Sequence, residues 1–196
     1  SLFRQAALVN LYFFLKYVAS YSAPFDKLDR ALHGEICNAR QMALEEGARY
    51  ALVLPRSTFK STTWTVGGAA WEMLRNRNIR MGIFSFPADR SEDFVRQVKA
   101  IFDNNDLLHE LDPTCIPPTG KGVRWNDSEL VMPGRTMDYA EASLTAYTAG
   151  GATQGIHLDV GEIDDIVGDS MLNANRGATA DMISMGNWFD DNQNVI

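Results

Sequence analysis

Cysteine and histidine are scarce in this sequence. Its two cysteines, Cys37 and Cys115, lie far apart and in no paired motif. This scarcity excludes a disulfide framework and a cysteine-based zinc site, and it predicts reduced thiols in an intracellular protein. The three histidines, His33, His109 and His157, show no metal-ligand spacing, so we expect structural or surface roles for them.

Long uninterrupted hydrophobic runs are also missing. The N-terminal stretch is apolar, but Arg4, Gln5, Asn10 and Lys16 interrupt it, which excludes a membrane span. We expect residues 1–25 to form a helical segment that packs on the core or on a partner. The alternative is a signal peptide with a cleavage site near Tyr21-Ser22-Ala23.

Positive charge is in deficit. Eighteen Lys and Arg against 25 Asp and Glu give a net charge of −7, which disfavours a free-standing module that coats duplex DNA. A local basic patch stays possible, and Arg75, Arg77 and Arg80 form one candidate, although a solvated turn is the more ordinary role for them. Hydrophobic residues make up 45% of the chain, enough for a packed core. No repeat or low-complexity tract interrupts it.

Apolar periodicity predicts strands that alternate with helices. This alternation is typical of an α/β domain with a mainly parallel sheet. We expect helices at 1–20, 26–46, 60–75, 89–102 and 171–188. We expect strands at 50–54, 79–85, 123–125, 129–132, 143–148 and 158–163, and a long loop at 103–122.

The most informative stretch runs from Tyr50 to Thr63. An apolar run is followed by a loop, by Lys60-Ser61-Thr62, and by a helical pattern, which is the order of a phosphate-binding loop. Backbone N–H groups of such a loop and the N-terminus of the next helix face phosphate oxygens. Leu54 and Phe59 occupy positions where glycine is usual. The alternative is a surface lysine beside a serine that caps a helix.

Two adjacent carboxylates, Asp164 and Asp165, end an apolar strand about a hundred residues later. In a nucleotide hydrolase with a phosphate-binding loop, one acid holds Mg²⁺ and its neighbour orients the attacking water. Ligands of parallel sheets bind beyond the carboxyl ends of the strands, where both motifs are expected to lie. The alternative is a solvated turn. Glu162 is unusual inside the strand, and its role stays open.

These stretches, in their order and spacing, resemble the ATPase domain of the large terminase subunit of tailed bacteriophages. The resemblance covers roughly residues 30–190. It is carried by Pro55–Thr62, Phe84-Ser85 and Ala88 with Asn104–Leu108, Trp125 with Glu129–Met132, Ser143–Ala146 before Gly150-Gly151, and Thr153–Asp159 running into Asp164-Asp165. Ser57 and Phe59 depart from glycines often found in the family, and Glu162 departs from an apolar residue.

The resemblance implies a P-loop NTPase fold over residues 26–196 and hydrolysis of ATP with Mg²⁺. It assigns ATP contacts to Arg56, Ser57, Thr58, Phe59, Lys60, Ser61 and Thr62. It assigns Mg²⁺ to Ser61 and Asp164, and catalysis to Lys60, Arg56 and Asp165. No arginine stands in the 154–157 stretch, where some relatives place one that reaches a neighbour's ATP.

The implied activity is translocation of double-stranded viral DNA into a procapsid in the host cytoplasm. The implied partners are DNA, bound weakly by this chain, a portal protein, a small terminase subunit and further copies in a ring. Full-length relatives also carry a nuclease domain, and we expect this chain to be a fragment without it. Two alternatives stay open: an ATP-binding assembly or clamp module with little turnover, and a helicase-like or recombination ATPase.

Overall fold

The computed structural model describes residues 1–21, 24–47, 49–120, 122–151 and 153–164. The α-helices are α1 (Leu2–Val9), α2 (Leu11–Phe13), α3 (Arg30–Glu46), α4 (Gly68–Arg75), α5 (Ala88–Asp103) and α6 (Asp106–Leu111). Helical turns of other kinds are Phe14–Val18 and Thr62–Gly67, which are π-helical, and Ala19–Tyr21, Pro24–Lys27 and Pro113–Cys115, which are 3₁₀. The strands are β1 (Met81–Ser85), β2 (Glu129–Leu130), β3 (Leu144–Thr148) and β4 (Val160–Ile163).

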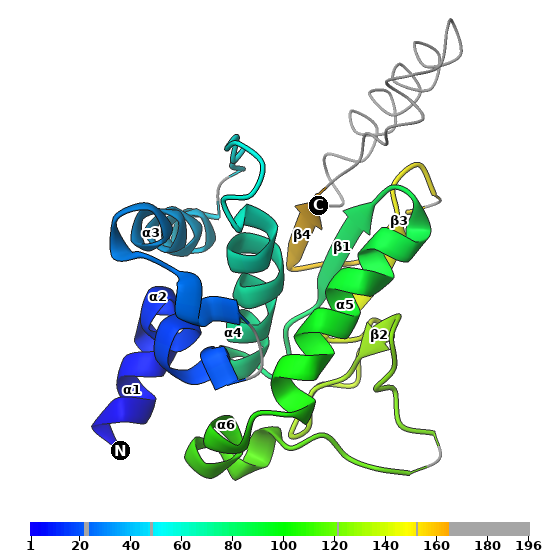
Figure 1. The fold of residues 1–196 in the computed structure, drawn as a ribbon. Coiled ribbons are helices and arrows are strands. Elements are labelled where there is room, and N and C mark those ends of the chain that lie inside the picture. The colour runs from blue at the N-terminus through cyan, green and yellow to red at the C-terminus, as the bar shows by residue number, and fades with distance from the viewer. Residues whose placement is uncertain (22–23, 48, 121, 152, 165–196) are drawn as a thin grey trace, which may run out of the picture.

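The strands form one small, mostly parallel sheet in the order β2-β3-β1-β4. The central strand β1 pairs in parallel with β3 and with β4, whereas the short β2 pairs antiparallel with β3. Figure 1 shows α5 lying along β1 and β3, and α1 to α4 gathered on the side of β4. The protein is therefore a mixed α/β structure with helices flanking the sheet, as the alternating pattern predicted.

A single buried cluster joins the N-terminal helices to the sheet. It includes Leu11 and Phe14 from the N-terminal segment, Trp71 from α4 and Ile83 from β1. The Trp71 indole Nε1 donates a hydrogen bond to the Ala7 carbonyl over 2.8 Å, which fixes α1 against α4. The N-terminal segment thus packs on the core, as expected. None of the helices in the described part of the chain is long and apolar enough to cross a bilayer.

Local signals explain where α3 begins and ends. The Asp29 carboxylate accepts a hydrogen bond from the Leu32 backbone N–H over 2.9 Å, which caps the first turn. Gly47 ends the helix with a φ of 59°, a left-handed conformation that glycine adopts without a Cβ penalty. The buried side of α3 includes Ile36, Cys37 and Arg40, whereas Leu32 is exposed.

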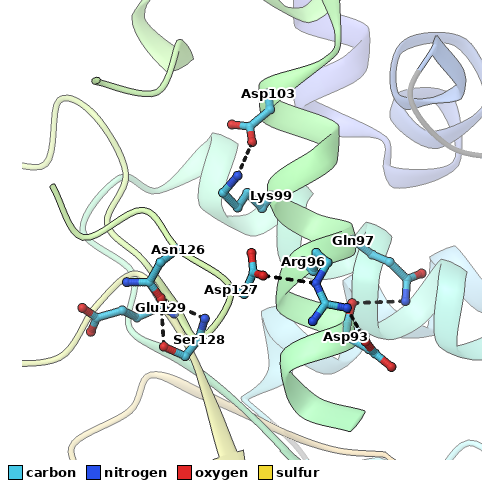
Figure 2. Close-up of polar contacts among 9 residues, drawn as sticks. All are labelled: Asp93, Arg96, Gln97, Lys99, Asp103, Asn126, Asp127, Ser128 and Glu129. Atoms are coloured by element: carbon cyan, nitrogen blue, oxygen red, sulfur yellow. Dashed lines mark hydrogen bonds and ion pairs between the residues drawn. The ribbon is translucent and has the colours of Figure 1, made fainter. Parts of the chain in front are cut away.

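The outer face of α5 is tied to the turn before β2 by polar contacts. Arg96 on α5 donates to the Asp127 carboxylate over 3.3 Å (Figure 2). Within the turn, the Asn126 side-chain oxygen accepts hydrogen bonds from the backbone N–H groups of Ser128 and Glu129 at 2.9 and 3.0 Å. These contacts lie at the surface, where α5 passes the turn before β2.

Three predictions about elements were wrong. Residues 50–54 form no strand: they are irregular, and Val53 is 89% exposed. The expected loop at 103–122 contains α6, which begins where Asn105 caps it by accepting from the Leu108 N–H. The strand expected at 123–125 is reduced to a single bridge between Trp125 and Leu130. The helix expected at 171–188 lies outside the described residues.

Candidate functional site

The loop that was predicted to bind phosphate leads directly into a helix. The chain is helical from residue 60 through the π-helical turn to the end of α4 at Arg75. Lys60 and Ser61 therefore stand at the N-terminus of this helix, where unpaired backbone N–H groups and the helix dipole favour an anion. The strand expected before the loop is absent, so the loop is held by other contacts.

The backbone of the loop is strained at two residues. Ser57 has a φ of 66° and Phe59 a φ of 51°, a region that costs residues other than glycine about 1–2 kcal/mol. These are the two positions at which the sequence departs from the glycines of the resembled loop. The loop thus takes a turn that suits glycine although neither residue is one. Strain of this kind gathers at ligand-binding sites.

Contacts from within the loop and from α3 maintain this turn. The Lys60 ammonium donates to the Leu54 carbonyl over 3.2 Å, and the Thr58 hydroxyl donates to the Pro55 carbonyl over 2.8 Å. His33 of α3 lies 3.2 Å from the Thr58 carbonyl through Nε2. Its Nδ1 lies 3.1 Å from the Asp29 backbone nitrogen, 3.2 Å from the Asp29 carbonyl oxygen and 3.1 Å from Oδ2 of the Asp29 carboxylate. His33 therefore has a structural role at the loop.

Asp164 lies beside the same helix, at the end of β4. Its Oδ2 accepts a hydrogen bond from the Thr65 hydroxyl over 2.9 Å. Thr65 is four residues after Ser61, so both side chains lie on one face of the helix. The backbone of Asp164 is fixed to β1, because its N–H donates to the Phe84 carbonyl over 3.0 Å and its carbonyl accepts from the Ser85 hydroxyl over 2.6 Å. The fold thus joins Asp164, through Thr65, to the helix that begins with Lys60 and Ser61.

A buried ion pair stands two residues before Asp164. The Arg40 guanidinium of α3 donates to the Glu162 carboxylate of β4, and both side chains are almost fully buried. Burial raises the pKa of Glu162 to about 7 although Arg40 acts in the opposite direction, and the charges of Asp164 and Glu72 add to the rise. Glu162 thus faces the inside of the domain, which answers the question that its position in the strand left open.

A cavity of about 680 Å³ separates β4 from the irregular segment after α3. Its wall is formed by the C-terminal half of α3, by residues 49–52, by the start of the helix with Lys60, Ser61 and Trp64, and by residues 159–164. This volume is within the range of small-molecule sites. The helix N-terminus, Asp164 and the Arg40–Glu162 pair all border it.

The remaining predicted residues are placed as follows. Arg56 is exposed on the loop, and Thr62 begins the π-helical turn. Asp165, the expected catalytic acid, lies outside the described residues. Sequence reasoning missed Arg40 and Thr65 and gave His33 no link to the loop. In the sequence, only the charged Glu162 inside an apolar strand signalled that a buried cation was needed.

In the described ranges, no three His, Cys, Asp or Glu side chains gather closely enough to hold a metal ion. Magnesium in nucleotide sites is usually held by one or two protein groups and by phosphate oxygens, so such a site does not require three protein ligands. No family model, curated protein or solved structure matches this chain.

Proposed function

We propose that this chain binds MgATP at the 55–62 loop and hydrolyses it, as a P-loop NTPase related to the packaging ATPase of tailed phages. One observation carries the proposal: a strained loop ends in Lys60-Ser61 at a helix N-terminus, and the same helix contacts Asp164 through Thr65. Cation, hydroxyl and carboxylate are the side chains that a phosphate–magnesium site requires. The resemblance in sequence supports the same assignment.

Each residue has a defined task in this proposal. Lys60 exchanges its contact with the Leu54 carbonyl for a phosphate oxygen, and the helix N-terminus adds backbone N–H donors. Ser61 and Asp164 hold Mg²⁺, which supplies charge neutralisation at the phosphates. Arg56, exposed on the loop, is available to the γ-phosphate. Asp165 orients the attacking water, a role assigned from the sequence alone.

A binding module with little turnover is the second candidate. Phe59 favours it, because a bulky side chain stands at a left-handed position inside the phosphate loop. Steady-state release of phosphate, with and without DNA, separates the two candidates. Hydrolysis that exceeds a Lys60→Ala background supports the ATPase, whereas tight ATP binding without turnover supports the module.

Titration with a fluorescent ATP analogue tests the site itself. Lys60→Ala removes charge-assisted contacts worth about 1.5–3 kcal/mol each, so we expect affinity to fall by roughly 10- to 150-fold. Lys27→Ala, at an exposed position that is part of neither the loop nor the cavity wall, is the matched control and should bind as the wild type does. A folded Lys60→Ala protein with wild-type affinity would show that the nucleotide site is elsewhere.

The proposed biological role is translocation of viral double-stranded DNA with a portal protein, a small terminase subunit and further copies of this chain. The basic candidate patch gives little support for strong DNA binding by the chain alone. Arg75 contacts Glu72, Arg77 contacts Asp112, and Arg80 contacts Asp159. Because each of these cations is already paired, we expect DNA affinity to come mainly from assembly.

A further inference from the structure

The buried Arg40–Glu162 pair connects three elements that border the cavity. Arg40 comes from α3, and its guanidinium reaches Glu162 in β4 after crossing the helix that begins at Lys60. Gly68 makes this crossing possible, because a Cβ there would overlap the guanidinium. Arg40 also lies 5.6 Å from the centre of the ring of Trp64, a residue of the same helix. The guanidinium of Arg40 therefore packs closely against Gly68 and lies near the ring of Trp64.

Stability alone does not account for this pair. Removing two charges from water costs several kcal/mol per ion, and well-packed apolar residues are often as stabilising as a buried ion pair. The pair here is also incompletely satisfied. Within the described residues, Arg40 Nε and Glu162 Oε2 are buried and have no hydrogen-bond partner. An incompletely satisfied buried pair calls for an explanation other than packing.

The position of β4 in the sheet explains why the Arg40–Glu162 pair is needed. Its one partner in the described part of the sheet is β1, and its other edge borders the cavity. The lateral position of β4 therefore depends on side chains. Glu162 and Asp164 are two residues apart and lie on the same face of the strand. Arg40 holds the first and Thr65 holds the second, both against the helix that presents Ser61.

We propose that Arg40 and Glu162 are a positioning pair that holds the end of β4 at the separation from the helix N-terminus at which Asp164 and Ser61 bind one Mg²⁺. The inference rests on the nucleotide site proposed above. Neither residue touches the metal or the nucleotide. The pair acts by limiting where the Asp164 carboxylate can lie relative to Ser61.

The test replaces both charges at once, with Arg40→Met and Glu162→Leu. A single Arg40→Ala change would leave a buried, unpaired carboxylate and would endanger folding. The apolar pair should unfold at the same or a higher urea concentration than the wild type. In the same protein, we compare the affinity for the ATP analogue in Mg²⁺ with the affinity in EDTA. The ratio of the two should fall by about 10-fold, because a residue that positions a metal ligand has been lost. Affinity in EDTA should not change.

Two further variants keep the test decisive. Arg124→Gln with Glu129→Gln removes a bidentate pair across β2, far along the sheet from β4, and should keep the full effect of Mg²⁺. Glu162→Gln keeps the volume of the side chain and an acceptor for Arg40, so it yields the measurement even if the apolar pair fails to fold. We expect it to lose part of the Mg²⁺ effect.

The outcomes separate the two proposals. Wild-type protein that binds no ATP analogue overturns both the nucleotide site and the positioning pair. Wild-type protein that binds in a Mg²⁺-dependent manner, together with folded Arg40 and Glu162 variants whose Mg²⁺ dependence is unchanged, overturns the positioning pair alone. Loss of affinity in EDTA and in Mg²⁺ by the same factor also overturns it, because a general structural defect would produce that result.

Discussion

The Thr65 hydroxyl donates a hydrogen bond to Asp164 Oδ2 over 2.9 Å, across 99 residues of sequence. This bond joins the helix that follows the strained loop to the end of the edge strand β4. It connects Asp164 to the helix that begins with Lys60 and Ser61.

Two neighbouring buried threonines allow this bond to be measured. Thr65→Val removes a hydroxyl that contacts a carboxylate, and we expect the free energy of unfolding to fall by about 1.5–3 kcal/mol. Thr63 is equally buried, but its Oγ1 has no partner among the described residues. Thr63→Val should therefore be neutral or stabilising in the same urea titration. Equal losses in the two variants would contradict the contact.

Substitutions of Asp164 and Asp165 should affect different properties, ATP binding in one case and turnover in the other. Asp164→Asn should weaken Mg²⁺-dependent binding of ATP, because Asp164 is the proposed metal ligand. Asp165→Asn should leave binding largely intact and lower turnover, because it removes an interaction used mainly in the transition state. Binding affinity and steady-state phosphate release, measured on both variants, decide the assignment. The reverse pattern would exchange the two roles.

Strain in the loop predicts a stabilising substitution. Ser57 is exposed and has a φ of 66°, so Ser57→Gly relieves the left-handed penalty at the cost of a more flexible unfolded chain. We expect the free energy of unfolding to stay equal or to rise by up to about 1 kcal/mol. Ser57→Ala, which keeps a Cβ, is the control and should give no gain. A clear loss in Ser57→Gly would mean that the side chain itself holds the loop.

Thiol reactivity tests the packing of the core. Burial raises the pKa of Cys37 to about 12 and that of Cys115 to about 11. Because the thiolate is the reactive form and becomes populated only as pH approaches these values, both thiols should resist a thiol reagent at pH 8 in the native protein. Both should react at once in denaturant. Rapid labelling of native protein at either cysteine would show that its helix opens readily.

Assembly should raise activity. A net charge of −7 and the pairing of Arg75, Arg77 and Arg80 with carboxylates predict weak DNA binding that falls steeply with salt. Arginines of neighbouring subunits often complete such active sites, so specific ATPase activity should increase with protein concentration. Activity over a dilution series, and DNA binding at two salt concentrations, provide the measurements. High activity independent of concentration, with tight DNA binding that salt does not weaken, would contradict this expectation.

Local sequence was sufficient for elements with strong periodic patterns. The helix expected at 89–102 is α5, which buries Phe94, Val98 and Phe102, and the helix expected at 26–46 ends where α3 does. The helix from 60 to 75 and the strands at β1, β3 and β4 were also predicted within a few residues. The signal for α6 was present as well, because Asn105 is a strong cap before an apolar run, but neighbouring proline and glycine concealed it.

The run from Tyr50 to Leu54 shows where local sequence fails. Its composition suits a strand, but a strand exists only where a partner supplies backbone hydrogen bonds. In this structure the neighbouring edge of β4 is separated from it by the cavity, and the run stays irregular. No property of five consecutive residues can specify whether a partner is present.

The sequence by itself determined the residue types of the candidate site, because Lys60, Ser61 and Asp164 follow motifs whose spacing is a local property. Only the tertiary structure decided which groups hold them. Arg40, Thr65 and His33 act through contacts that span 122, 99 and 25 residues of chain. Such contacts depend on how helices cross and how strands order themselves in the sheet. The physical reason is that burial and ion pairing depend on several elements at once. A buried charge such as that of Glu162 costs free energy unless a residue from another element, here Arg40, pairs with it.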